Sequence, residues 1–126
     1  MKNTLLICSL ICVTTFIDAQ NTIVMDTIYA NDHKNVAIFF PNPIRQGVTG
    51  AENFVFNYNR EKEQYFGLLQ ATPGTESNLL TITNDGQVYT YILKYAEQLP
   101  ELNYFIPQEK SIGNEKPNSK ISNTDS

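Results

Sequence analysis

Short runs of apolar residues, separated by turn residues about every eight to twelve positions, dominate the chain. Within residues 53–58, Phe54, Phe56 and Tyr58 alternate with mostly polar residues, which is the period of a half-buried strand. Beyond the first nineteen residues, no segment shows a convincing helical period. The pattern predicts an all-β domain, with strands at residues 22–25, 27–29, 36–40, 53–58, 65–71, 78–83, 87–95 and, as a last short strand, within 99–106.

Residues 36–40 (VAIFF) are apolar on both faces, which predicts a fully buried strand. The sequence Pro41-Asn42-Pro43 ends this strand, because proline cannot donate a hydrogen bond to a sheet ladder. The following residues, 44–52, contain Gly47 and Gly50 and are too many for a tight hairpin. We therefore expect them to form a connection that crosses between two sheets.

The clearest hairpin signal lies at Asp85-Gly86, between two alternating runs. In the second run, alternate residues from Tyr89 to Tyr95 share one face, and we expect this strand to be central to its sheet. The tyrosines could pack in the core or form an exposed stripe that binds sugar or protein. The core is favoured, because the other face of the strand carries Thr90 and Lys94.

Together these signals predict an antiparallel β-sandwich, immunoglobulin-like or barrel-like. Gly67, inside the run 65–71, indicates a bulge or a close backbone approach. From Pro107 onward the sequence is polar and cannot bury enough apolar surface to offset the entropy of ordering it. We expect one β-sandwich domain over residues 20–107, followed by a disordered tail or truncated linker over residues 108–126.

The first nineteen residues have the layout of a secretory signal peptide. Lys2 precedes an apolar run from Leu5 to Phe16, and Ala19 offers a small residue before a mature start at Gln20. An uncleaved membrane anchor is the alternative, but the run is shorter than the roughly 20 residues that span a bilayer. We therefore expect an exported protein.

Cysteine usage and charge exclude several classes of function. Cys8 and Cys12 both lie in the leader, so the mature chain has no thiol chemistry, and the lack of disulfides favours the bacterial periplasm. The formal net charge is -4, and no cluster of Lys or Arg compensates for it. A nucleic-acid-binding protein would show a basic patch, so we expect no direct nucleic-acid binding.

No group of residues has the spacing of an active site. His33 is the one histidine, and a zinc site needs three or four ligands, so it is interpreted as a turn residue. Residues 46–50 (QGVTG) do not lead into a helix as a phosphate-binding loop does, and Ser77 lacks a nucleophile-elbow context. We expect no catalytic residue, no metal and no cofactor.

Three segments carry a family resemblance: Phe39–Gly50 (FFPNPIRQGVTG), Asn57–Phe66 (NYNREKEQYF) and Ile112–Pro117 (IGNEKP). From about Asp26 to Pro117, the chain resembles the N-terminal β domain of the TraN proteins of Bacteroides-type conjugative transposons. It is more distantly similar to the periplasmic β subunit of type IV secretion core complexes.

The resemblance implies a non-catalytic structural subunit of a conjugative transfer apparatus. Such a subunit would lie in the periplasm, contact other proteins of the apparatus in a multi-subunit complex, and associate with the outer membrane through them. Family members continue into a second, C-terminal domain, whereas this sequence ends in a polar tail, which suggests a truncated form.

Within this interpretation, the candidate partner contact is the segment 41–50, represented by Pro41, Pro43, Arg45 and Gly47. Arg45 is its single cation, and the planar guanidinium can make several directed hydrogen bonds at an interface. A segment that merely connects the two sheets explains these residues equally well. The alternative function is a stand-alone exported binding module, carbohydrate-binding or adhesin-like, that uses the tyrosine stripe.

Overall fold

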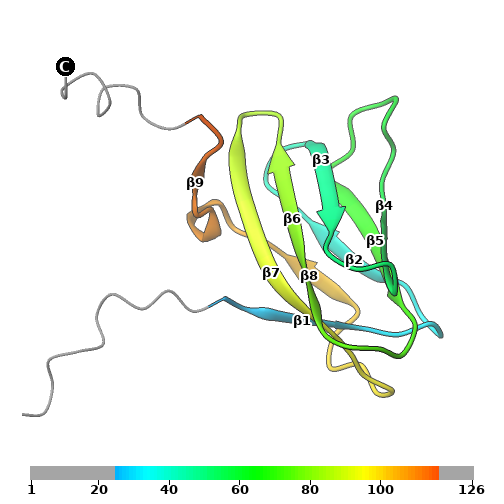
Figure 1. The fold of residues 1–126 in the computed structure, drawn as a ribbon. Coiled ribbons are helices and arrows are strands. Elements are labelled where there is room, and N and C mark those ends of the chain that lie inside the picture. Colours follow the sequence, from blue (N-terminus) through cyan, green and yellow to red (C-terminus); the bar gives the residue numbers. More distant parts are fainter. Residues whose placement is uncertain (1–24, 117–126) are drawn as a thin grey trace, which may run out of the picture.

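A computed structural model describes residues 25–116 and shows two β-sheets packed face to face (Figure 1). The order of strands in the first sheet, sheet A, is β1-β7-β6-β3, and the short β9 also pairs with β7; the order in the second, sheet B, is β4-β5-β2-β8. The strands of sheet A are β1 (Thr27–Ala30), β3 (Ile44–Thr49), β6 (Ser77–Thr83), β7 (Gln87–Tyr95) and β9 (Gly113–Asn114). Those of sheet B are β2 (Val36–Phe39), β4 (Phe54–Asn57), β5 (Phe66–Ala71) and β8 (Asn103–Phe105).

The predicted all-β sandwich is confirmed, but its sheets are mixed rather than purely antiparallel. β1 pairs with β7 in parallel, and β2 pairs with β8 in parallel, whereas the other strand pairs are antiparallel. Parallel partners need a long crossover between them, and here most of the domain lies between each pair. Local turn signals do not report such distant pairings.

The core lies between the two sheets and consists of the inward-facing residues of both. The strand β7 runs through the middle of sheet A, between β6 on one side and β1 with β9 on the other. Its inward residues Tyr89, Tyr91 and Leu93 are buried, so the tyrosine face packs in the core as expected. The hairpin before it turns at Gly86, whose φ of 86° is readily adopted by glycine.

The prediction for residues 44–52 is wrong in part, because Ile44–Thr49 forms the edge strand β3 of sheet A. The chain leaves sheet B at Phe39, so residues 40–43 make the crossing between the sheets. The sequence analysis did not predict this strand because Gly47 and Gly50 were interpreted as part of a connection. Gly47 lies in the strand because the aromatic ring of Phe56 occupies the place of a side chain: a Cβ there would lie 2.8 Å from the ring.

The strand β2 is also not fully buried. Val36, Ile38 and Phe40 point into the core, whereas Ala37 and Phe39 lie on the outer face of sheet B and are partly exposed. The outer face therefore carries apolar side chains that an ordinary alternating strand would replace with polar ones.

The polar segment after Pro107 belongs to the domain as far as Lys116, contrary to the expected boundary. It contains a 3-10 helix, Gln108–Lys110, and the strand β9. Backbone hydrogen bonds hold it to sheet A, from the Ile112 N–H to the Val88 carbonyl (2.8 Å) and from the Glu115 N–H to the Gly86 carbonyl (2.7 Å). Hydrogen bonds thus supply the attachment that the apolar content does not. The expected signal peptide, residues 22–24 of the strand expected at 22–25, and the tail from 117 lie outside the described residues; Met25, the last residue of that expected strand, is not in a strand.

Hydrogen bonds join the two sheets along β3 and β4, and a hollow opens between them along β1 and β8. On the first side, the Gly47 N–H of β3 donates to the Tyr58 hydroxyl (3.0 Å), and the Thr49 hydroxyl donates to the Phe54 carbonyl of β4 (2.9 Å). On the second side, the edges of β1 and β8 frame a surface hollow. We call these the closed side and the open side of the sandwich.

Candidate functional site

The four residues predicted to contact a partner do not gather into one exposed site. Pro41 and Pro43 lie in the crossing between the sheets, where Pro43 is buried and its carbonyl accepts a hydrogen bond from the Asn84 N–H (2.8 Å). Gly47 faces the Phe56 ring from β3. Packing and backbone hydrogen bonding account for these three residues, and a partner contact through them stays a prediction.

Arg45 is engaged within the chain. Its guanidinium forms a two-pronged ion pair with the Glu115 carboxylate, in which Nη1 lies 2.7 Å from Oε2 and Nη2 contacts Oε1. The hydrogen bond with Glu115 raises the pKa of Arg45, and the hydrogen bond with Arg45 lowers the pKa of Glu115. The Arg45 guanidinium, which was expected to contact a partner, therefore binds the segment after β9 to β3.

The outer face of sheet B presents the most conspicuous surface feature, a row of three phenylalanines on adjacent strands. Phe39 of β2 is in register with Phe66 of β5 and with Phe105 of β8. The rings of Phe39 and Phe105 stack with centroids 4.6 Å apart and planes 7° apart, and the rings of Phe39 and Phe66 are 5.2 Å apart. We call these three residues the aromatic row. Phe105 ends the row at the sheet edge and is 72% exposed.

No charged side chain shares this face within the described strands of sheet B. By alternation with the buried residues, the outward positions are Val55 and Asn57 of β4, Phe66, Leu68 and Gln70 of β5, Ala37 and Phe39 of β2, and Asn103 and Phe105 of β8. The outer face of sheet A differs, because Lys94 lies there beside Glu76, with Nζ 3.6 Å from Oε1. An uncharged, partly apolar sheet face is typical of a surface that another molecule covers.

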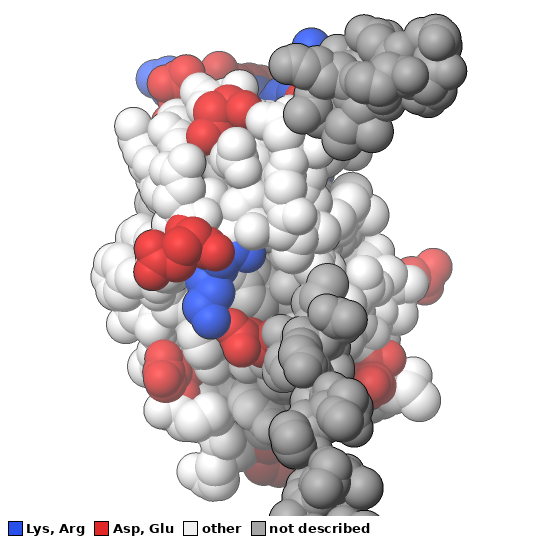
Figure 2. All heavy atoms as spheres, turned by 90° about the vertical axis from the view of Figure 1, so that its left-hand side faces the viewer, with Lys and Arg blue, Asp and Glu red and all other residues white. Residues whose placement is uncertain are grey.

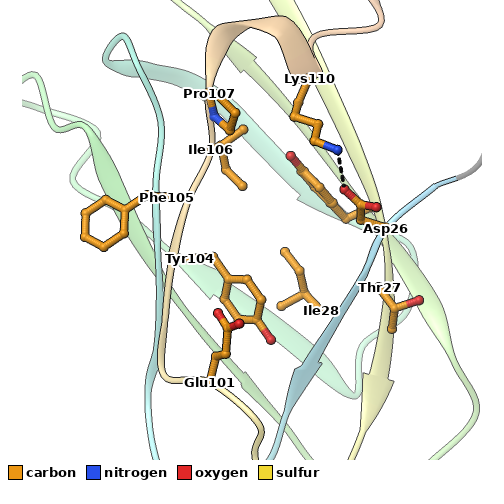
Figure 3. A pocket seen from close by; sticks show the side chains of 10 residues that line it. Asp26, Thr27, Ile28, Glu101, Tyr104, Phe105, Ile106, Pro107 and Lys110 are labelled. Carbon is orange, nitrogen blue, oxygen red and sulfur yellow. Dashed lines mark ion pairs between the residues drawn. The ribbon is translucent and has the colours of Figure 1, made fainter.

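A hollow of about 350 Å³ opens beside the aromatic row, on the open side of the sandwich. It is lined by residues from both sheets and from the 3-10 helix, including Asp26, Ile28, Tyr91, Tyr104, Phe105 and Lys110. Figure 3 shows Ile28 and Tyr104 side by side within it, whereas the Phe105 ring points away from it. Asp26 and Lys110 form an ion pair at its rim, with Oδ2 and Nζ 3.2 Å apart.

Tyr91 lines this hollow and carries a polar group that the described residues leave unpaired. The residue is 4% exposed, and its hydroxyl has no hydrogen-bond partner among residues 25–116. Burial raises the pKa of the Tyr91 hydroxyl above its ordinary value of 10.0, and the Asp26 carboxylate adds to the shift. The hydroxyl therefore stays protonated at physiological pH and can still accept or donate a hydrogen bond.

His33 shows no constellation suited to catalysis. Its Nδ1 lies 3.3 Å from the Asp32 carboxylate and its Nε2 lies 3.5 Å from that of Glu97. All three side chains are largely exposed, and within residues 25–116 no group of His, Cys, Asp and Glu has the arrangement of a metal site. The same residues include no helix long and apolar enough to cross a membrane.

Charge is sparse on the side of the molecule that carries β9 and β1. Figure 2 shows acidic groups scattered over this side and a basic group in contact with acidic groups near its centre, with no basic patch among the described residues of the visible face.

Sequence reasoning missed the aromatic row because it treated residues 36–40 as a buried strand and weighed residues 99–106 alone. The alternate spacing of Ala37 and Phe39 is present in the sequence, but their exposure depends on which strand covers which face.

The chain matches no known family model, and comparison with curated proteins found no similar sequence.

Proposed function

We propose that the chain is a non-catalytic structural subunit of an envelope complex for conjugative transfer and that it acts through protein–protein contacts. The observation that carries this proposal is the uncharged outer face of sheet B with its exposed aromatic row. A monomer that works alone seldom leaves such a face in water, whereas a subunit covers it on assembly.

The resemblance of Phe39–Gly50, Asn57–Phe66 and Ile112–Pro117 to TraN proteins supports the choice of complex. A subunit of this kind would be exported to the periplasm and would associate with the outer membrane through its partners. The alternative, a stand-alone carbohydrate-binding or adhesin-like module, would use the tyrosine stripe. That surface is not available, because Tyr89 and Tyr91 are buried in the core.

Gene deletion tests the proposal. Removing the gene from a conjugative element should abolish or strongly reduce transfer frequency, and the wild-type gene in trans should restore it. The protein should also co-purify from the envelope with other proteins encoded among the conjugation genes. Unchanged transfer after deletion, or a gene position among polysaccharide-utilisation genes, would contradict the proposal.

A matched pair of variants tests the face itself. Leu68→Glu places a charge on the outer face of sheet B, and Ile92→Glu places the same charge on the outer face of sheet A, at a residue that is also partly exposed. Both proteins should fold, as judged by circular dichroism and melting temperature. Only Leu68→Glu should lose co-purification and transfer; equal behaviour of the two variants would argue against sheet B as the contact face.

A further inference from the structure

We propose that the open edge of β8 receives an extended segment of another subunit of the complex, which adds to sheet B as a fifth strand. This inference rests on the proposed function and names the surface through which it would work. Its occupant is a single stretch of a partner protein, with one side chain on the aromatic row and the next in the open-side hollow.

The first observation is the hydrogen-bonding direction of β8. The Leu102 carbonyl accepts a hydrogen bond from the Ala37 N–H (2.8 Å), and the Ile106 N–H donates to the Phe39 carbonyl (2.8 Å), so even-numbered residues face β2. In a parallel ladder the intervening residues face the opposite way. The N–H and C=O groups of Asn103 and Phe105 therefore point away from β2, in the plane of the sheet, where no described strand pairs with them.

The second observation is that the other end of sheet B is already covered. The edge strand β4 contacts β3 on the closed side, and its Phe54 carbonyl accepts a hydrogen bond from the Thr49 hydroxyl. The edge of β3 is interrupted by a bulge between Ile44 and Gln46 and carries Arg45. Bulges, charges and short length are devices that limit strand pairing at an edge; β8 has no bulge and no charge, and its three residues restrict pairing to a short segment.

The third observation is where the side chains of an added strand would lie. Side chains alternate between the two faces of a strand, and cross-strand neighbours share a face. A residue opposite Phe105 would lie on the outer face and could continue the stack that runs from Phe66 through Phe39. Its neighbour in the added strand would point inward, into the hollow lined by Ile28, Tyr91 and Tyr104.

The hollow also indicates the chemistry of the segment. Its walls are mainly apolar, but Glu101 lines it and forms no ion pair among the described residues. Asp26 is already paired with Lys110 at the opposite rim. The expected segment is extended, places an aromatic or branched apolar residue over Phe105, and carries Lys or Arg near Glu101.

Peptide binding tests the inference with the purified mature protein. The probes are synthetic peptides of about twelve residues that tile the exported proteins encoded beside the gene, a length that covers an ordinary strand. Control peptides tile the chain itself, including residues 20–24 and 117–126. We expect one tile from a neighbouring protein to bind and to slow hydrogen exchange at the amides of Asn103 and Phe105.

Two variants and a control locate the binding. Asn103→Pro removes an outward N–H, and Phe105→Lys places a charge at the end of the aromatic row; each should weaken binding about tenfold or more. Val48→Lys, at a residue 46% exposed on β3 of the other sheet, should leave binding within about twofold. Phe105→Lys leaves the backbone unconstrained, so it still tests the inference if Asn103→Pro fails to fold.

Several outcomes would overturn the inference. These are binding by none of the tiles, binding only by peptides of the chain itself, equal loss in Val48→Lys, or protection at β4 instead of β8. If deletion of the gene abolishes transfer while Phe105→Lys transfers normally, the strand-addition site is wrong and the structural role stands. If deletion has no effect on transfer, the proposed function itself is wrong.

Discussion

The ring of Phe56 is packed between two glycines, and this arrangement makes the substitution Gly67→Ala a sharp test of the core. A Cβ at Gly67 would meet Cζ of Phe56 and lie 2.6 Å from Cε1, and a Cβ at Gly47 would lie 2.8 Å from the same ring. Phe56 is buried, so its ring cannot swing into solvent. The added methyl group must therefore displace the ring or the strand β5.

The expected cost follows from two opposing effects. Overpacking a core by a methyl group costs about 1–3 kcal/mol. Replacing glycine by alanine returns about 0.4–1 kcal/mol by restricting the unfolded chain. We expect a net loss of about 1–2 kcal/mol, which lowers the melting temperature of a domain of this size by about 4–16 °C.

Urea unfolding and thermal melts of the purified protein, expressed as residues 20–126, measure this loss. The control is Gly50→Ala, where the added Cβ would meet the side chains of Asn78 and Ser77 at an exposed position, so they can move aside. Its stability should stay within about 0.5 kcal/mol of wild type. The double variant Gly67→Ala with Phe56→Leu should lose less than the sum of the single losses. A neutral or stabilising Gly67→Ala, or strict additivity in the cycle, would refute the packing of Phe56 described above.

Three further predictions concern polar groups and Gly47. Gly47→Ala should destabilise the domain, because the added Cβ would meet the same Phe56 ring. If Gly47 serves only packing, any loss of transfer in this variant should be reversed by a stabilising mutation elsewhere. Loss of transfer that persists at restored stability would support a partner contact. Glu115→Gln should lower the stability of the domain at pH 7 and make stability fall less steeply as the pH is lowered. The reason is that a carboxylate with a lowered pKa contributes stability above its ordinary pKa of 4.5 and loses it as pH falls through the lowered value. Equal acid titrations of variant and wild type would contradict the Arg45–Glu115 pair. Tyr91→Phe should raise stability by about 1 kcal/mol at pH 7, because it removes an unpaired buried hydroxyl. Since burial raises the pKa of Tyr91, its phenol destabilises the fold once pH exceeds 10.0, so the variant should also resist alkaline unfolding better; a less stable variant would show that the hydroxyl is hydrogen-bonded.

Much of the fold was predictable because it is encoded in local patterns. The alternation of Phe54 with Phe56 and the turn at Asp85-Gly86 both depend on residues close in sequence, and both were interpreted correctly. At Gly67 the sequence predicted a bulge or a close backbone approach, whereas the structure places the side-chain ring of Phe56 there. The edge strand β3 was missed because its glycine is explained by a ring from another strand, which no local pattern reveals.

The candidate site depends on long-range pairing and was therefore beyond reach of the sequence. Phe39 looked like one more core residue, and Phe105 like part of a weak last strand. Their significance arises when β8 pairs in parallel with β2, which stacks the two rings on an outer face and leaves Asn103 and Phe105 at an edge. Arg45 shows the converse, since it looked available for a partner and is paired with a residue 70 positions away.

The asymmetry of the sandwich explains why an interface would form at β8 rather than at the segment 41–50. On the closed side, Gly47, Thr49 and Arg45 use their polar groups within the chain, so a partner there would have to displace existing bonds. On the open side, the outward backbone groups of β8 have no partner among the described residues, so a partner there would replace water rather than existing hydrogen bonds of the protein. Edge pairing also adds little apolar area for a three-residue strand, so affinity must come from the residues over Phe105 and in the hollow. Binding should therefore depend on the side chains at those two positions more than on the length of the segment.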